Sequence, residues 1–167
     1  FAGMPVAVCA NLPYYITTPL IMKLIEESEK ARVLVVMVQD DVATRLCAAE
    51  NTPEYGAITA AIARRAEAEA VKLVPRHLFT PAPNVDSAVV RLPFVEDRIP
   101  VKDKKMYRAA VRAAFLSRRK TLENNLINSF ALSREQAQEV LRQAGIPPKA
   151  RGEELSPQTL AQHADAV

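Results

Sequence analysis

Glycine is scarce in this chain, and its scarcity limits the cofactor sites that the sequence can encode. The four glycines, Gly3, Gly56, Gly145 and Gly152, form no G-x-G arrangement. Dinucleotide-binding turns and P-loops both need closely spaced glycines, because only these let the backbone approach a phosphate closely. Neither kind of phosphate site is therefore predicted within these 167 residues.

Cysteine and histidine are equally rare, with two of each. Cys9 and Cys47 lie far apart in apolar or helical surroundings, which favours buried, reduced thiols over a disulfide and fits a reducing compartment. His77 and His163 are isolated, and neither cysteine has a partner at the spacing of metal ligands. We therefore expect no metal site and a cytoplasmic location.

Long apolar runs are also missing. No run approaches the roughly 20 residues of a membrane span. The first residues lack the charged flank, apolar stretch and small-residue cleavage site of a signal peptide. Because 49% of the residues are hydrophobic and 25% are charged, the composition indicates a soluble globular protein without a membrane partner.

Apolar runs alternate with helical patterns in the first part of the chain. Residues 6–10 and 33–38 are continuous apolar runs, typical of strands buried on both faces of a parallel sheet. A helix is expected after the first run, with Thr18 as its N-cap and Pro19 at its first position. The remaining pattern predicts helices over residues 40–49 and 55–65, strands over 68–74 and 87–92, and a proline-rich loop over 75–84. This alternation predicts an α/β fold.

The first strand suggests that the sequence is incomplete. In doubly wound sheets the ligand crevice lies where the strand order switches, so the central strand needs neighbours on both sides. This chain begins directly on a strand that looks central. A bare apolar edge would be an aggregation hazard, so we expect a fragment of a longer chain, whose exposed edge could pair with that of another copy.

After Pro93 the pattern becomes helical. Ser133 and Gln136 form a capping box, and Gly145 marks a helix end. The expected helices cover residues 104–117, 120–130, 134–144 and 157–166. The sequence thus predicts an α/β unit over residues 1–97 and an all-α unit over residues 98–167.

The segment Asn11-Leu12-Pro13-Tyr14 lies at the carboxyl end of the first strand, where α/β enzymes place ligand-handling residues. One chemistry that this segment could serve is methylation of an adenine exocyclic amine. This amine is a poor nucleophile, because its lone pair is delocalised into the ring. Its methylation therefore needs acceptors that hold the N–H groups, and the Asn11 side-chain carbonyl with a neighbouring backbone carbonyl can serve. Pro13 stiffens the turn, and Tyr14 can stack on an extruded base. A plain strand-ending turn is the alternative interpretation.

A second candidate site is the proline-rich loop that leads from Leu78 into the strand beginning at Ser87. Pro81 and Pro83 fix this loop, and Phe79 stands at its start. A rigid aromatic platform could result. A buried loop phenylalanine is the alternative.

Positive charge is concentrated in one segment, although the net charge of the chain is only +3. Residues 98–120 contain nine basic residues and one acidic residue, Asp103. Solvated faces usually mix signs, so a nearly one-signed helical face favours contacts to a phosphate backbone. On a helical wheel five of these residues share an arc of roughly 100°: Lys104, Lys105, Arg108, Arg112 and Arg119. Arg118, Arg119 and Lys120 would extend the basic surface.

Five motifs occur in a recognisable order. They are Asn11 to Tyr15 with the following Ile-Thr-Thr-Pro, Val38-Gln39, Glu54-Tyr55-Gly56, Phe79-Thr-Pro-Ala-Pro-Asn-Val-Asp-Ser-Ala-Val, and Arg118-Arg119-Lys120-Thr-Leu. In order and spacing they resemble the C-terminal portion of the ribosomal RNA adenine dimethyltransferase family of the KsgA type.

The resemblance implies a fold and an activity. The fold would be the C-terminal half of a Rossmann-like class I methyltransferase sheet, followed by a small all-α domain. The activity would be S-adenosylmethionine-dependent dimethylation of N6 of two adjacent adenines in a 3′-terminal hairpin of small-subunit ribosomal RNA. Such enzymes act during ribosome biogenesis, so the implied partners are this RNA and the immature small ribosomal subunit.

The resemblance also implies residue roles. Asn11, with the backbone at Leu12 and Pro13, would orient the amine beside the methyl donor, and Asn11 would contact the cofactor. Tyr14 and Phe79 would hold the adenine. RNA binding would fall to Lys104, Lys105, Arg108, Arg112, Arg118, Arg119 and Lys120. The family's glycine-rich loop and ribose-binding acid should precede residue 1, so we expect this chain alone to bind S-adenosylmethionine weakly or not at all and to be inactive.

Two other functions fit part of the sequence. A non-catalytic RNA-binding or ribosome-assembly factor would need only the basic helices, whereas the Asn11 motif favours catalysis. An adenine methyltransferase acting on DNA would share an Asn-Pro-aromatic motif, but the helical part and the length of the resemblance argue against it. Methylation activity would discriminate between catalysis and binding.

Overall fold

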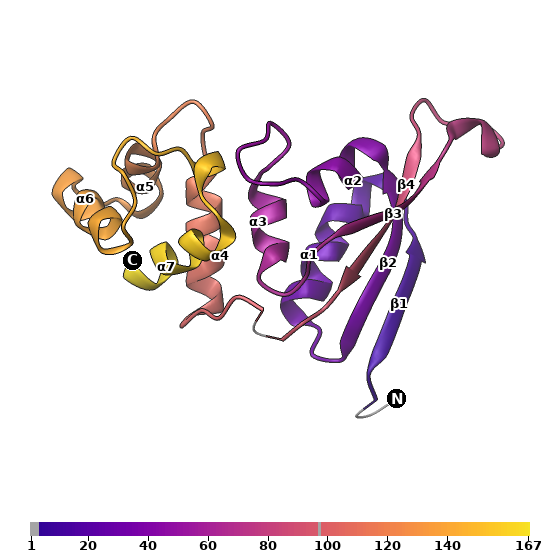
Figure 1. Ribbon diagram of the computed structural model, residues 1–167, viewed down its shortest axis with the longest axis horizontal. Helices are drawn as coiled ribbons and strands as arrows, with labels where there is room; N and C mark the ends of the chain where they lie inside the picture. The colour runs from indigo at the N-terminus through magenta and orange to yellow at the C-terminus, as the bar shows by residue number, and fades with distance from the viewer. Residues whose placement is uncertain (1–3, 97) are drawn as a thin grey trace.

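The structure, a computed structural model, describes residues 4–96 and 98–167. Its first part is a four-stranded sheet with three helices on one side (Figure 1). The elements are β1 (Val6–Asn11), α1 (Thr17–Glu27), β2 (Ala31–Gln39), α2 (Asp40–Leu46), α3 (Ala57–Ala63), β3 (Glu69–Val74) and β4 (Ser87–Pro93). Short 3-10 turns, η1 (Tyr14–Ile16) and η2 (Arg76–Leu78), follow β1 and β3. The predicted α/β architecture is confirmed.

The sheet is mixed and has the order β1-β2-β4-β3. Only β1 and β2 pair in parallel, because β4 lies between β2 and β3 and runs antiparallel to both. The expectation of parallel strands at residues 6–10 and 33–38 is therefore confirmed. The β3–β4 hairpin reverses the chain, which returns β4 between β2 and β3 without a crossover helix.

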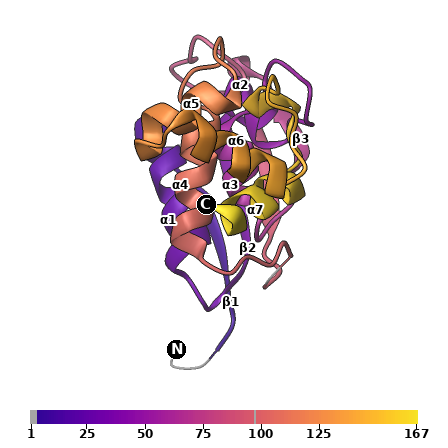
Figure 2. The same cartoon turned by 90° about the vertical axis from the view of Figure 1, so that its left-hand side faces the viewer.

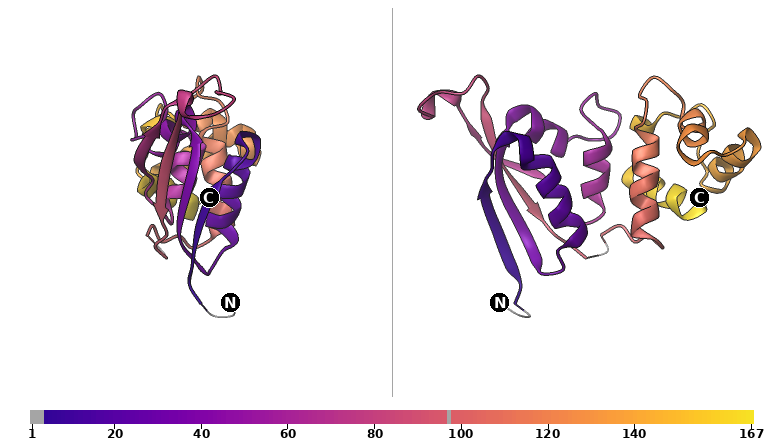
Figure 3. Two further views of the ribbon diagram at one scale, coloured as in Figure 1. Left: turned by 90° about the vertical axis from the view of Figure 1, so that its right-hand side faces the viewer. Right: turned by 180° about the vertical axis from the view of Figure 1, so that it is seen from behind.

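The expectation that β1 is buried on both faces is wrong. Ala7, Cys9 and Asn11 are exposed, and the alternate residues are half-buried against the helices. β1 lies at the edge of the sheet, and in the part of the chain that the structure describes no helix covers its second face (Figure 3, left). For the same reason Cys9 is exposed. Cys47, just after α2, is exposed too, so both thiols are free as expected but neither is buried.

Helix α1 begins earlier than its sequence suggests. Its N-cap is Ile16, and Pro19 is the third helical residue, so Thr18 is not the cap. The hydroxyl of Thr17 instead donates to the Pro13 carbonyl at 3.3 Å, which starts the helix directly from the 3-10 turn. Helices α2 and α3 are shorter than predicted, since residues 47–56 form turns and loops between them.

The second part consists of α4 (Lys104–Ala114), α5 (Leu122–Phe130), α6 (Arg134–Gln143), the 3-10 turn η3 (Gly152–Glu154) and α7 (Pro157–Ala166). The capping box of Ser133 and Gln136 is confirmed. Gly145 follows the end of α6 and has a left-handed conformation, with φ of +67°, as expected of a glycine that ends a helix. Helix α4 stops at Ala114, three residues before the predicted end.

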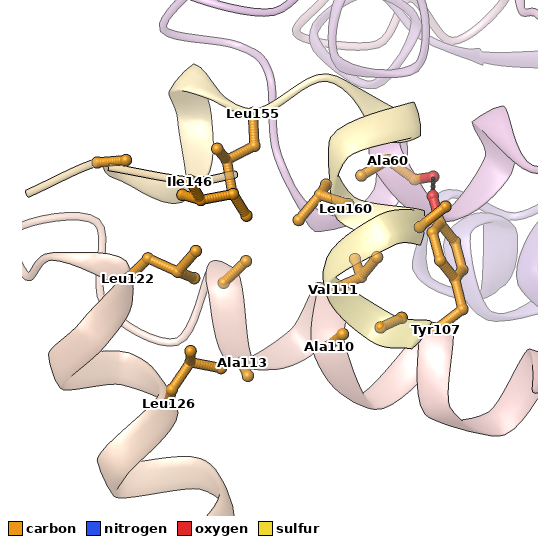
Figure 4. Packing of buried hydrophobic residues seen from close by; sticks show 14 of the residues in the cluster. Ala60, Tyr107, Ala110, Val111, Ala113, Leu122, Leu126, Ile146, Leu155 and Leu160 are labelled. Carbon is orange, nitrogen blue, oxygen red and sulfur yellow. Dashed lines mark hydrogen bonds between the residues drawn. The ribbon is translucent and has the colours of Figure 1, made fainter. Parts of the chain in front are cut away.

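The two parts share packing. Viewed from the helical side, α4 to α7 lie in front of the α1–α3 layer (Figure 2). Tyr55 and Ala60, from the first part, belong to the hydrophobic core of the helices. The Tyr107 hydroxyl donates to the Ala60 carbonyl at 2.7 Å (Figure 4). The predicted division falls at Asp97, which lies outside the described residues, so the division at 97/98 stays a prediction.

No helix among the described residues is long and apolar enough to cross a membrane.

His163 on α7 is fully buried, and neither ring nitrogen has a hydrogen-bond partner. Burial lowers its pKa to about 4, because the cationic form cannot be solvated there. In the unfolded chain the imidazole takes up a proton near pH 6.5. The free energy of unfolding should therefore be unaffected by this group above about pH 7 and should fall as the pH drops from 6.5 towards 4.

We predict that His163→Leu removes this pH dependence. Between pH 7 and pH 5 the native chain should lose about 2 kcal/mol more stability than the variant, as measured by urea denaturation. His77→Leu, at an exposed position, should behave like the native chain. Equal losses in the native chain and in His163→Leu would contradict the assignment.

Candidate active site

Strand pairing brings the predicted site segments to one end of the sheet. Asn11 ends β1 opposite Met37, two residues before the end of the parallel strand β2. Ser87, the first residue of β4, pairs with Gln39 on one side and Val74 on the other. The turn after β1 and the loop of residues 75–86 therefore leave the same end of the sheet (Figure 1).

The Asn11 turn leaves two acceptors unused. The Pro13 carbonyl is occupied, since it accepts from the Ile16 amide at 3.2 Å and from the Thr17 hydroxyl at 3.3 Å. Within the described residues, by contrast, no donor bonds the Asn11 side-chain oxygen or the Leu12 carbonyl. Asn11 is exposed, on the face of the sheet that the helices leave open. An incoming amine with two N–H groups could meet both acceptors.

Tyr14 lies in the single 3-10 turn that follows Pro13, and its side chain is anchored. Its hydroxyl shares a hydrogen bond with the Ser87 hydroxyl at 3.0 Å. Tyr14 as a whole is 39% exposed, so part of its ring remains available to a stacking partner. Tyr15, in contrast, is 83% exposed.

Phe79 follows η2 and is half-buried. Its amide donates to the Arg76 carbonyl at 3.2 Å. The loop is fixed by the Asp86 carboxylate, which accepts from the Arg76 amide at 2.8 Å, and by the Asp86 carbonyl, which accepts from the Asp40 amide at 3.0 Å. Within the described part of the chain the rings in contact are those of Tyr55 and Phe115, so Phe79 is not stacked on Tyr14. Its role in holding a base stays a prediction.

Some features at this end were missed by sequence reasoning. Asp40 and Asp41, at the start of α2, line an open hollow of about 380 Å³ together with Arg76 and Asp86. Ser87 is fully buried and bonds Tyr14, a contact that the motif containing it does not predict. A serine at the start of an apolar strand carries no sequence signal, because its partner lies 73 residues away.

Asn11 is the one residue of this chain that was expected to touch S-adenosylmethionine, and it lies exposed at the carboxyl end of β1. Its contact with that cofactor stays a prediction. No group of three potential metal ligands occurs in residues 4–96 or 98–167.

The basic segment differs from its predicted form. Arg119 lies in a turn beyond α4, so the expectation of five cations on one helical face is wrong, because the helix stops at Ala114. Arg108 forms an ion pair with Glu26 of α1 at 2.7 Å. Arg118 lies 3.6 Å from the Glu153 carboxylate and donates to the Tyr55 carbonyl. Both arginines are therefore engaged within the protein.

The other five predicted RNA-binding residues are exposed and make no ion pair within the described part of the chain: Lys104, Lys105, Arg112, Arg119 and Lys120. Lys105 and Arg112 line a groove with the exposed Leu116 and with Phe130 of α5. The loop of residues 115–121 lies towards the same end of the molecule as the carboxyl end of β1 (Figure 1). The free cations of this loop, Arg119 and Lys120, therefore lie towards the end of the molecule that holds the candidate site, whereas Lys104 and Lys105 lie at the opposite end of α4.

The chain is similar in sequence to known ribosomal RNA methyltransferases. A family model described as ribosomal RNA adenine dimethylase matches residues 2–166. Ribosomal RNA small subunit methyltransferase A of Bacillus cytotoxicus is 46% identical over 173 residues, which cover 99% of this chain and 58% of that protein. The protein of the same description from Bacillus mycoides has the same identity and coverage. The chain thus spans a little over half the length of these curated relatives.

Two solved structures share the fold. A dimethyladenosine transferase from Plasmodium falciparum superposes with a TM-score of 0.82 at 23% identity, over 98% of this chain and 66% of that one. The 23S rRNA methyltransferase ErmE superposes with a TM-score of 0.68 at 23% identity, over 99% of this chain and 66% of that one.

Proposed function

The chain belongs to the ribosomal RNA adenine dimethylase family, and we propose that it carries the target-base side of an enzyme that dimethylates adenine N6. The substrate would be two adjacent adenines in a 3′-terminal hairpin of small-subunit ribosomal RNA. The enzyme would act in the cytoplasm on the immature small ribosomal subunit. The observation that carries the proposal is the pair of free acceptors, at Asn11 and Leu12, beside the anchored ring of Tyr14.

S-adenosylmethionine would supply an electrophilic methyl group at the carboxyl end of β1. The Asn11 side-chain oxygen and the Leu12 carbonyl would accept the two N–H groups of the adenine amine. Holding both hydrogens lets the nitrogen pyramidalise, which returns its lone pair from the ring to the nitrogen. As positive charge develops on this nitrogen during transfer, both oxygens stabilise it electrostatically.

Tyr14 would stack on the extruded adenine and replace part of the stacking that the base loses in the RNA. Phe79, in the loop that leads into β4 at Ser87, would close on the opposite face of the base. The free cations Lys104, Lys105, Arg112, Arg119 and Lys120 would bind phosphates of the hairpin and position it without reading its sequence. Because no glycine-rich turn is present among these residues, we propose that tight cofactor binding needs the part of the relatives' length that this chain does not span.

The first test replaces the side-chain acceptor. We expect Asn11→Ala to lower methyl transfer about 100-fold or more, since a positioned acceptor that stabilises developing charge contributes a few kcal/mol. The assay uses this chain extended with the part of the Bacillus cytotoxicus relative that it does not span. Mass spectrometry of nucleosides from the RNA measures the methylated adenosines.

The matched control is Asn128→Ala, which removes an exposed asparagine of α5 in the helical part and should leave turnover unchanged. Full turnover by Asn11→Ala would eliminate the proposed role. A complete absence of methylation by the unmodified extended chain would favour a non-catalytic RNA-binding factor.

The second test concerns the basic surface. Reversing the charge of Lys105 and Arg112 together should weaken binding to the RNA hairpin and reduce the salt dependence of the affinity by roughly one unit of slope per residue. Lys149→Glu, at an exposed lysine outside the segment, is the control. An unchanged salt slope in the double variant would reject the assignment.

Arg108→Gln should behave differently from these charge reversals. Its pairing with Glu26 predicts a loss of stability with a smaller change in the salt slope, because that charge is already neutralised within the protein.

A further inference from the structure

The hydrogen bond between Tyr14 and Ser87 joins the two motifs of the candidate site. The hydroxyl oxygens are 3.0 Å apart, although the residues are 73 positions apart in the sequence. Ser87 belongs to the loop-and-strand motif that also contains Phe79, and Tyr14 belongs to the turn that contains Asn11. This contact therefore fixes one aromatic residue of the site relative to the other motif.

Ser87 is a rigid anchor. It is fully buried, and its backbone pairs with Gln39 of β2 and with Val74 of β3. Strands on both sides thus fix the position of its hydroxyl. The preceding residue is held as well, since the Asp86 carbonyl accepts from the Asp40 amide at 3.0 Å.

Tyr14 has a much looser environment. It lies in a 3-10 turn of three residues, outside any strand or α-helix, and it is 39% exposed. Its backbone position is set by the turn, but its ring could rotate about two side-chain torsions. A hydrogen bond at the hydroxyl end removes that freedom while leaving part of the ring face open.

We propose that Ser87 is a positioning residue for base methylation: its hydroxyl holds the Tyr14 ring in the orientation that stacks on the target adenine. The inference rests on the proposed function, and Ser87 acts through Tyr14 without touching the base. Fixing the ring before binding lowers the ordering cost of capturing the extruded base. The same bond ties the Asn11 turn to the strand that follows the Phe79 loop, so the two sides of the base pocket keep a constant separation.

The experiment compares Ser87→Ala and Tyr14→Phe in the extended chain. Tyr14→Phe retains the aromatic ring and removes only the hydroxyl, so it loses the anchor without leaving a cavity. Since one neutral hydrogen bond is lost in each case, both variants should lower kcat by about 3- to 10-fold. The KM for S-adenosylmethionine should stay unchanged. The double variant should be no slower than either single variant, because both remove the same interaction.

Two further variants separate positioning from stability. Ser87→Thr retains a hydroxyl and should recover most of the lost rate. Ser156→Ala removes the hydroxyl that caps α7, where it accepts from the Thr159 amide at 3.1 Å. That control should lower the thermal midpoint and leave kcat unchanged at temperatures where the protein is folded.

A purely structural role for Ser87 gives a different result. Ser87→Ala would then lower stability with unchanged kcat, Tyr14→Phe would retain full activity, and the inference would be overturned. Effects that multiply in the double variant would also overturn it.

A second measurement keeps the inference testable if the extended chain shows no methylation, which would refute the proposed function instead. Carbon-13-labelled tyrosine rings report ring mobility by nuclear magnetic resonance. The inference predicts that Ser87→Ala changes the Tyr14 ring signals towards those of a freely rotating ring, with Tyr55 and Tyr107 unaffected. Unaltered Tyr14 signals would refute the anchoring role.

Discussion

The pairing of β2 with strands of opposite direction on its two sides determines where the Asn11 turn and the Phe79 loop lie. β1 runs parallel to β2, and β4 runs antiparallel to it. One end of the sheet therefore collects the end of β1, the end of β2 and the start of β4. A one-residue shift of β4 against β2 would turn Ser87 to the opposite face of the sheet and break its contact with Tyr14. The chemistry proposed for Asn11 depends on the same pairing, because the pairing brings the Asn11 turn to the end of the sheet from which the Phe79 loop leaves.

The helical part is coupled to this sheet by specific contacts. Tyr107 donates to the Ala60 carbonyl, Arg108 pairs with Glu26, and Arg118 donates to the Tyr55 carbonyl. Each contact joins the segment that follows residue 98 to a helix or loop of the α/β part. The free cations of the basic segment are consequently held in a defined position relative to the candidate site, which the proposed positioning of RNA requires.

Local patterns in the sequence were sufficient for most elements. The apolar runs at residues 6–10 and 33–38 are strands, and the capping box at Ser133 gives the start of α6, because both signals depend on neighbouring residues.

Burial was harder to predict. Cys9 is exposed because β1 is an edge strand. The residues of β1 would be the same whether or not another strand paired with this edge, so the sequence does not show that the edge is open. The candidate site was likewise predictable only in part. The Asn11 motif is evident in the sequence, whereas the contact of Ser87 with Tyr14 is not, because it joins residues that are 73 positions apart. The ion pair of Arg108 with Glu26 also joins distant positions that no periodicity relates.

The most direct test of this account is the transfer of labelled methyl groups from S-adenosylmethionine to small-subunit ribosomal RNA in immature subunits. The chain alone is compared with the chain extended by the part of its Bacillus cytotoxicus relative that it does not span. The account predicts N6,N6-dimethyladenosine with the extended chain and none with the chain alone. Absence of dimethyladenosine with an extended chain that is folded and binds the RNA would contradict it.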